Sequence, residues 1–202
     1  MAVQSKKRRL SSSDRKAKII DAAVGLFAEK GYETTSIDEI AAKAGITKPV
    51  VYDHFESKEQ LFISILELIR DDLLKRGAAV VAGAPSHEER LKGSIGAFLD
   101  FVQEQPERAR VLIIGSKGAP SIAEACRRVQ AQATHGIAQL IKSQKPHFRS
   151  SPKQERLLLL TAEFVKKGMH GLADWWLDHP ELSRSEVESA LMEVLMRGLS
   201  SD

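Results

Sequence analysis

A short segment near the N-terminus gathers side chains that can donate hydrogen bonds to phosphates and to DNA base edges. A lysine can donate to guanine O6 or N7, a valine can contact a thymine methyl group, and hydroxyl or imidazole groups suit phosphate oxygens. All these types lie off the apolar face of one predicted helix, as Thr47, Lys48, Pro49, Val50, Tyr52 and His54. This spacing indicates a helix that enters the major groove. Each residue also has an ordinary alternative: Lys48 as a solvated lysine, Tyr52 and His54 as packing residues.

The surrounding residues predict two short helices joined by a tight turn, which is a helix-turn-helix. Helix 37–44 ends at Gly45, and helix 47–55 tolerates Pro49 because a proline in the first turn needs no N–H partner. Helices this short need support from the helices before and after them. Lys58, at the start of the next helix, adds a predicted phosphate contact.

Helical periodicity extends over almost the whole chain, and strand-like alternation is missing. Five serines, each followed three residues later by Glu or Gln, are predicted helix caps: Ser36, Ser57, Ser86, Ser151 and Ser183. The sequence therefore predicts an all-α fold of about nine helices. They are expected over 13–30, 37–44, 47–55, 57–77, 87–105, 107–114, 121–144, 152–178 and 184–199.

Composition and charge place the chain among ordinary globular proteins. The 202 residues are 43% apolar and 28% charged, and no apolar run reaches the roughly 18 residues that span a bilayer. One cysteine, Cys126, and no secretory signal suit the cytoplasm. The net charge is only +3, but the first 18 residues carry seven of the basic side chains. Residues 1–12 are therefore predicted to be a flexible basic arm that binds DNA phosphates or, alternatively, only improves solubility.

Catalysis has no support in these residues. A di-metal helical bundle needs Glu-x-x-His pairs, but no histidine follows an acidic residue by three positions. P-loop and Gly-x-Ser-x-Gly patterns are also missing. We expect no enzyme activity, no cofactor and no bound metal.

Residues 26–62 closely resemble the N-terminal domain of the TetR family of bacterial transcriptional regulators. The matching pieces include Gly31-Tyr32, Ala44-Gly45-Ile46 and His54-Phe55. The match also covers Thr35-Ser36, Thr47-Lys48, Tyr52 and Ser57-Lys58-Glu59, which places Thr35 and Ser36 in the predicted DNA-binding set. Pro49 and Val50 depart from residues usual in the family, so the base preference is not carried over.

The resemblance implies a helix-turn-helix domain at 13–60 and an effector-binding and dimerisation domain at 61–202, bridged by the helix 57–77. The predicted helix 152–178 supports dimerisation independently because it carries two neighbouring apolar stripes. The domain core covers one stripe, and a partner subunit would cover the other, unless both are internal. The predicted interface consists of Leu158, Val165, Gly168, Gly171, Leu172, Trp175 and Trp176, with Val187, Leu191, Val194 and Leu195 of the last helix.

A ligand pocket is predicted among residues on the inward faces of several helices. It is lined by Phe98, Phe101, Val102, Ile113, Cys126, Val129, Phe164 and Met169, any of which can alternatively be core filler. Few charged groups share those faces, so we expect a small, mainly apolar effector. Together these features predict a homodimeric repressor that leaves a palindromic operator when it binds the effector. The alternative is a constitutive dimeric DNA binder without an effector.

Overall fold

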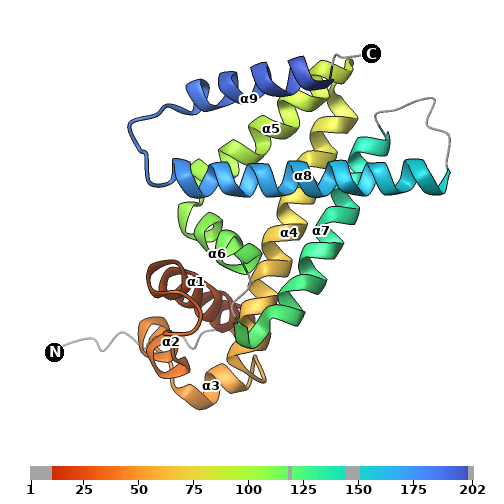
Figure 1. Cartoon of the computed structure of the whole chain (residues 1–202). Coiled ribbons are helices and arrows are strands. Elements are labelled where there is room, and N and C mark those ends of the chain that lie inside the picture. Colours follow the sequence, from red (N-terminus) through yellow and green to blue (C-terminus); the bar gives the residue numbers. More distant parts are fainter. Residues whose placement is uncertain (1–10, 118–119, 144–150, 200–202) are drawn as a thin grey trace.

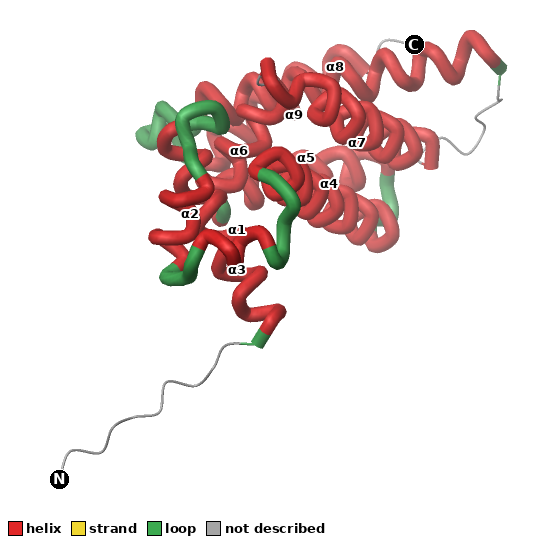
Figure 2. Tube along the Cα trace, turned by 90° about the horizontal axis from the view of Figure 1, so that it is seen from below, coloured by secondary structure: helices red, strands yellow, loops and turns green. Residues whose placement is uncertain are grey.

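The computed structural model describes residues 11–117, 120–143 and 151–199, and these ranges contain helices and no strand (Figure 2). The all-α prediction is therefore confirmed. The elements are α1 (Ser12–Lys30), α2 (Ile37–Ala44), α3 (Lys48–Tyr52), α4 (Lys58–Gly83), α5 (His87–Glu104), α6 (Pro106–Lys117), η1 (Pro120–Ile122), α7 (Ala123–Ser143), α8 (Pro152–Trp176) and α9 (Arg184–Leu199). Residues 1–10 of the predicted basic arm lie outside the described residues.

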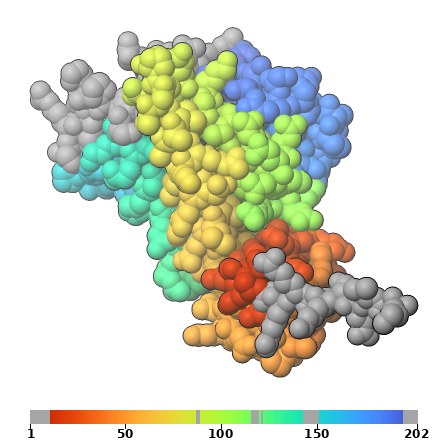
Figure 3. Space-filling model, turned by 180° about the vertical axis from the view of Figure 1, so that it is seen from behind, coloured from red at the N-terminus to blue at the C-terminus, as the bar shows by residue number. Residues whose placement is uncertain are grey.

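Helix α4 organises the molecule (Figure 1). Helices α1, α2 and α3 gather around its N-terminal end, and α5, α6 and α7 pack along the rest of its length. Seen from behind, α4 is a continuous ridge between α5 and α7 (Figure 3). Helix α8 packs on α6 and α7, and α9 packs on α5. A single cluster of buried apolar residues extends from α1 to α9.

The helix starts follow the predicted serine caps. The hydroxyl groups of Ser36, Ser57, Ser86, Ser151 and Ser183 each accept a hydrogen bond from the backbone N–H three residues later. Such a cap satisfies a backbone donor that the first helical turn leaves without a partner. An additional capping box, formed by Ser11 and Asp14, begins α1.

Two helix boundaries differ from the sequence prediction. Helix α3 ends at Tyr52 rather than near position 55, although backbone hydrogen bonds of the helical type continue to Phe55. Helix α4 continues to Gly83, whereas the sequence indicated an end near 77 followed by a linker. The extension is stabilised by packing, since Val80 lies directly against Gly93 of α5.

Three glycines form flat surfaces on which side chains of α4 rest. A Cβ atom added to Gly115 of α6 would lie 2.6 Å from Leu66, and one added to Gly136 of α7 would lie 2.6 Å from Leu74. At Gly93 of α5 the corresponding distance to Val80 is 2.4 Å. All three are far below van der Waals contact, so only glycine permits α4 to approach this closely. We call these three contacts the glycine sockets of α4.

Candidate nucleic-acid interface

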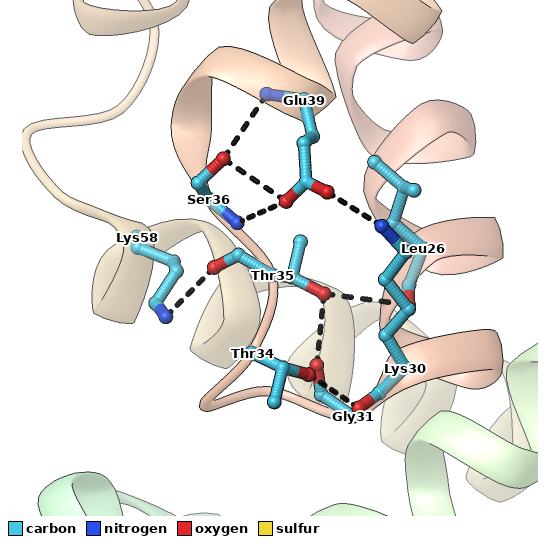
Figure 4. Close-up of polar contacts among 8 residues, drawn as sticks. All are labelled: Leu26, Lys30, Gly31, Thr34, Thr35, Ser36, Glu39 and Lys58. Atoms are coloured by element: carbon cyan, nitrogen blue, oxygen red, sulfur yellow. Dashed lines mark hydrogen bonds and ion pairs between the residues drawn. The ribbon is translucent and has the colours of Figure 1, made fainter.

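Helix α2 is fixed to α1 by a network of polar contacts at its N-terminus (Figure 4). Ser36 and Glu39 form a complete capping box, and Lys30 of α1 donates to Glu39 Oε1 at 2.5 Å. The Lys30 ammonium, together with the N–H and hydroxyl of Ser36, lowers the pKa of Glu39 to about 2. The carboxylate therefore stays charged over the whole physiological range, and α2 keeps its position against α1.

Thr35 and Ser36 thus support the fold of this domain. Thr35 is buried, and its hydroxyl donates to the backbone carbonyl of Gly31 at 2.8 Å. This burial contradicts a direct contact of the Thr35 side chain with DNA. Ser36 is exposed, but its hydroxyl is occupied by the capping box.

Helix α3 presents the predicted base-reading residues to solvent. Thr47, Lys48, Pro49 and Tyr52 are exposed, while Val50 and His54 are partly buried. Gly45 makes the turn before α3 with a φ of 67°, a left-handed conformation that disfavours side chains. Buried Val51 and Phe55 attach the helix to the domain core. Because Thr47 makes no side-chain cap hydrogen bond, its hydroxyl can bind another acceptor or donor.

Lys48 forms an ion pair with Asp38 of α2, with 2.9 Å between Nζ and Oδ2. The hydrogen bond to Asp38 raises the pKa of Lys48, so the side chain remains a cation. Both side chains are largely exposed, and such surface pairs contribute little to stability. The lysine can therefore exchange Asp38 for a base or a phosphate at small cost.

Lys58 is engaged within the domain, contrary to its predicted role as a phosphate ligand. Its ammonium donates to the carbonyl oxygens of Tyr32 at 2.9 Å, Glu33 at 3.3 Å and Thr35 at 2.9 Å (Figure 4 draws the Thr35 contact). It also lies 4.4 Å from the centre of the Tyr32 ring. These contacts use the three donors of the ammonium group. Lys58 therefore joins α4 to the turn between α1 and α2.

The structure adds Lys16 to the candidate interface. This exposed side chain of α1 extends to within 5.6 Å of the centre of the Phe55 ring, beside the end of α3. Sequence reasoning missed it because only the N-terminal excess of positive charge, and no local spacing, distinguished it from other basic residues.

Most of the predicted pocket residues pack into the apolar core. Phe101, Val102, Ile113, Cys126, Val129 and Met169 are buried in the apolar core, and Phe98 is partly buried against it. Phe164 is 74% exposed, which contradicts its predicted inward position. Two clefts of about 380 Å³ lie elsewhere: one between α5 and α9 beside Val80, the other between Asp21 and Val24 of α1 and residues 104–108.

Of the two neighbouring apolar stripes of α8, one packs within the chain and the other is exposed to solvent. Leu158, Val165, Leu172 and Trp176, all predicted at a dimer interface, pack within the chain, as does Val187 of α9. Trp176 is 7% exposed and donates from Nε1 to the Leu182 carbonyl, whereas Trp175 is 50% exposed. Leu191 is partly buried, and the side chain of Leu195 lies outside the described residues. The other stripe is exposed along the helix; we call it the apolar stripe of α8, formed by Leu157, Leu160, Phe164, Gly168, Gly171 and Trp175.

An exposed recognition helix on a small trihelical domain, joined through α4 to a larger helical domain, defines the class of helix-turn-helix regulators. Two family models describe the chain. Bacterial regulatory proteins of the tetR family match residues 19–65, and the C-terminal domain of tetracyclin repressor-like proteins matches residues 87–198. The chain therefore belongs to the TetR family of DNA-binding transcriptional regulators, which are not enzymes.

Several individual proteins are similar to it. The transcriptional activator FasR of Mycolicibacterium smegmatis is 32% identical over 104 residues, which are 52% of this chain and 48% of FasR. The match thus spans about half the length of that relative. A TetR-like regulator from Rhodococcus sp. RHA1 has a TM-score of 0.70 and 27% identity, covering 96% of this chain and all of the other. FadR of Bacillus subtilis, solved with stearoyl-CoA, has a TM-score of 0.68 and 16% identity over 89% of this chain and 96% of FadR.

No helix in the described part of the chain is long and apolar enough to cross a membrane. Likewise, the described residues contain no group of three or more His, Cys, Asp or Glu side chains that could bind a metal ion. Cys126 is buried, and this burial raises the pKa of its thiol.

Proposed function

We propose that the protein is a homodimeric repressor that leaves a palindromic operator when a small, mainly apolar effector binds its C-terminal domain. Similar proteins carry both kinds of name, activator for FasR and repressor for others. Release by an effector is the simpler mechanism for this chain, because it needs only a displacement of the recognition helices.

The observation that carries the proposal is that α4 belongs to both domains. At its first turn, Lys58 binds the carbonyl oxygens before α2. Two and four turns further along α4, Leu66 contacts Gly115 of α6 and Leu74 contacts Gly136 of α7, which are two of the glycine sockets. A ligand that separates α6 or α7 from α4 therefore also changes the support of α2 and α3. The ligand must bind the displaced form more tightly, because equal affinity for both forms shifts nothing.

The apolar stripe of α8 supports the homodimer. Phe164 and Leu160 are among its most exposed side chains, and Val194 of α9 is similarly exposed. Nothing in the described chain approaches a Cβ added at Gly168 or Gly171, so another helix can come close there. Exposed contiguous apolar surface of this kind marks protein interfaces. A two-fold dimer presents two recognition helices and requires an operator with the same symmetry.

An apolar effector fits the residues around the predicted pocket, which are mainly aromatic and aliphatic. The stearoyl-CoA bound to FadR of Bacillus subtilis is a long-chain molecule, but that protein resembles this chain at the level of the fold alone. We therefore define the effector only by its chemical class, as a molecule that consists mainly of hydrocarbon.

Selection of bound fragments from the source genome would supply the operator. We expect two half-sites about 10 bp apart or somewhat more, since successive major grooves face the same side at that spacing. A single asymmetric half-site bound at full affinity would contradict the dimeric mode.

The switch is tested by titrating an effector, found in a thermal-shift screen of apolar metabolites, with and without operator. A hundredfold release corresponds to about 2.7 kcal/mol of coupling, and operator must weaken effector binding by the same factor. Equal affinities in the two titrations would leave the constitutive dimeric DNA binder as the function.

A further inference from the structure

A group of polar side chains lies inside the C-terminal domain where α7 and α8 pack together. Lys166 of α8 is 3% exposed, and its ammonium donates to Thr134 Oγ1 at 2.6 Å and to the Gln130 carbonyl at 3.0 Å, both on α7. Its third partner is Glu163 Oε2 at 2.8 Å. The three donors of the ammonium are thus used, and its charge is neutralised by Glu163.

Three buried polar atoms on α5, α7 and α8 have no hydrogen-bond partner. They are Ser94 Oγ of α5, Gln130 Oε1 of α7 and His170 Nδ1 of α8. His170 is 8% exposed. A buried polar atom without a partner costs about 1–3 kcal/mol, so each of the three needs a physical explanation.

Contacts with shared neighbours link the residues that carry these three atoms. His170 lies one turn after Lys166 on α8, and its ring stacks on Phe98 of α5 with 6.2 Å between centres. Ser94 lies one turn before Phe98. Gln130 contributes the carbonyl that Lys166 binds. Phe98 packs against the apolar core, so His170, which stacks on it, lies beside apolar side chains.

The charges of the cluster exclude one class of ligand. Lys166 is already paired, and burial, reinforced by the nearby Lys166 and Lys167, lowers the pKa of His170 to about 4. At neutral pH the cluster therefore offers hydrogen bonds but no unpaired positive charge. A carboxylate placed here would lose its hydration without gaining a counter-ion.

We propose that Ser94, Gln130 and His170 form the polar anchor of the effector site, and that they select an apolar molecule bearing a neutral group that both donates and accepts hydrogen bonds, such as a hydroxyl or a primary amide. The Ser94 hydroxyl can donate or accept, and the Gln130 oxygen accepts. The ring nitrogen of neutral His170 does either, according to its tautomer. This inference rests on the proposed function and defines its effector class more narrowly.

The unliganded protein provides the first test. His170→Phe, Ser94→Ala and Gln130→Met each remove an unpartnered atom, so we expect thermal unfolding at an unchanged or higher temperature. Thr134→Val is the matched control: its hydroxyl is buried and fully bonded, so its loss should lower the unfolding temperature. A decrease in all three anchor variants as large as in Thr134→Val would overturn the proposal, because the groups would then have internal partners such as ordered water.

The second test compares probes that differ only in the polar end. Linear primary alcohols and the matching carboxylates, each with eight, twelve or sixteen carbons, are titrated against the full chain. At the best chain length we expect the alcohol to bind at least about tenfold more tightly than the carboxylate, and His170→Phe to remove that preference. Equal affinity of the pair, or no binding by any alcohol, would overturn the anchor. An alcohol that binds but leaves the operator occupied would instead refute the proposed release, while the anchor would stand.

Discussion

Lys58 shows how the role of a residue can change between sequence and structure. Its position at the start of a helix beside a recognition helix suits a phosphate contact. The structure instead surrounds its ammonium with three carbonyl oxygens that lie more than twenty residues earlier in the chain. Such distant partners leave no trace in local spacing. Lys58 therefore stabilises the turn before α2.

We predict that Lys58→Met destabilises the protein by about 1–3 kcal/mol, because three carbonyl oxygens lose a charged donor. Urea unfolding measures the change. The salt dependence of operator binding should keep its slope, since no phosphate contact is lost. Lys48→Ala is the control with the opposite pattern: little change in stability, but a relaxed base preference at one position in each half-site. A shallower salt dependence of operator binding in Lys58→Met would instead indicate that Lys58 contacts a phosphate.

His170 should make the folded state sensitive to acid. The folded protein binds a proton at His170 with a pKa of about 4, below the ordinary value of 6.5, so the unfolded chain binds more protons between these values. The stabilisation is complete above about pH 6.5 and is lost as the pH falls towards 4. A full shift of this size is worth about 3 kcal/mol. The side chains of Lys166, Lys167 and Glu163 act electrostatically on this imidazole: the two lysines lower its pKa, and the glutamate raises it.

Unfolding free energies measured between pH 7 and 4 should therefore fall less steeply in His170→Phe than in the unaltered chain. His135→Phe is the matched control, because His135 is an exposed histidine of α7. Identical pH profiles for His170→Phe and the unaltered protein would show that the buried imidazole is not the acid-sensitive group.

At the scale of the helix, substitution by alanine should change stability in opposite directions at two glycines, Gly115 and Gly25, although an added Cβ atom would lie about equally close to a neighbour at both. At Gly115, a new methyl group meets three atoms of Leu66, a buried side chain of α4 that cannot leave. We expect Gly115→Ala to lower the unfolding free energy by about 1–3 kcal/mol. At Gly25 of α1 the nearest atom is Lys43 Nζ, the end of a flexible exposed side chain. Gly25→Ala should gain about 0.5–1 kcal/mol from helix propensity. Urea unfolding of both variants measures these changes. Stabilisation by Gly115→Ala would contradict the prediction and show that Leu66 can move to accommodate the methyl group.

Helix starts could be predicted from the sequence because a serine cap and its partner lie three residues apart. Helix ends were less accessible, since α4 continues to Gly83 through the contact of Val80 with Gly93 in another helix. The orientation of α8 was also hidden. Its two apolar stripes look alike in sequence, and only the packing of α6 and α7 decides that Trp176 is internal and Trp175 external. The exposure of Lys48 and Tyr52 on α3 could be predicted because it follows from their buried neighbours, Val51 and Phe55.

At the scale of the whole molecule, the apolar stripe of α8 predicts a specific assembly. Phe164→Glu places a charge in the middle of the stripe, where a partner helix would bury it. We expect a monomer in sedimentation and a large loss of operator affinity with the fold intact by circular dichroism. Arg156→Glu introduces the same side chain on the same helix, at an exposed position beside the stripe, and should remain dimeric. A dimeric Phe164→Glu protein would move the interface elsewhere.

For the proposed effector-controlled repressor, the glycine sockets predict how related compounds would differ in their effect. Each socket is a close contact of bare backbone with one branched side chain, and dispersion forces of this kind fade within about an ångström. The branched side chain is therefore either in contact with the glycine or displaced from it, and intermediate positions retain little of the dispersion energy. Compounds that differ by one methylene should therefore divide into two groups, inducers and silent binders, rather than form a graded series. Occupancy of the C-terminal domain and derepression would then be separate quantities, and chain length would be the variable that divides them.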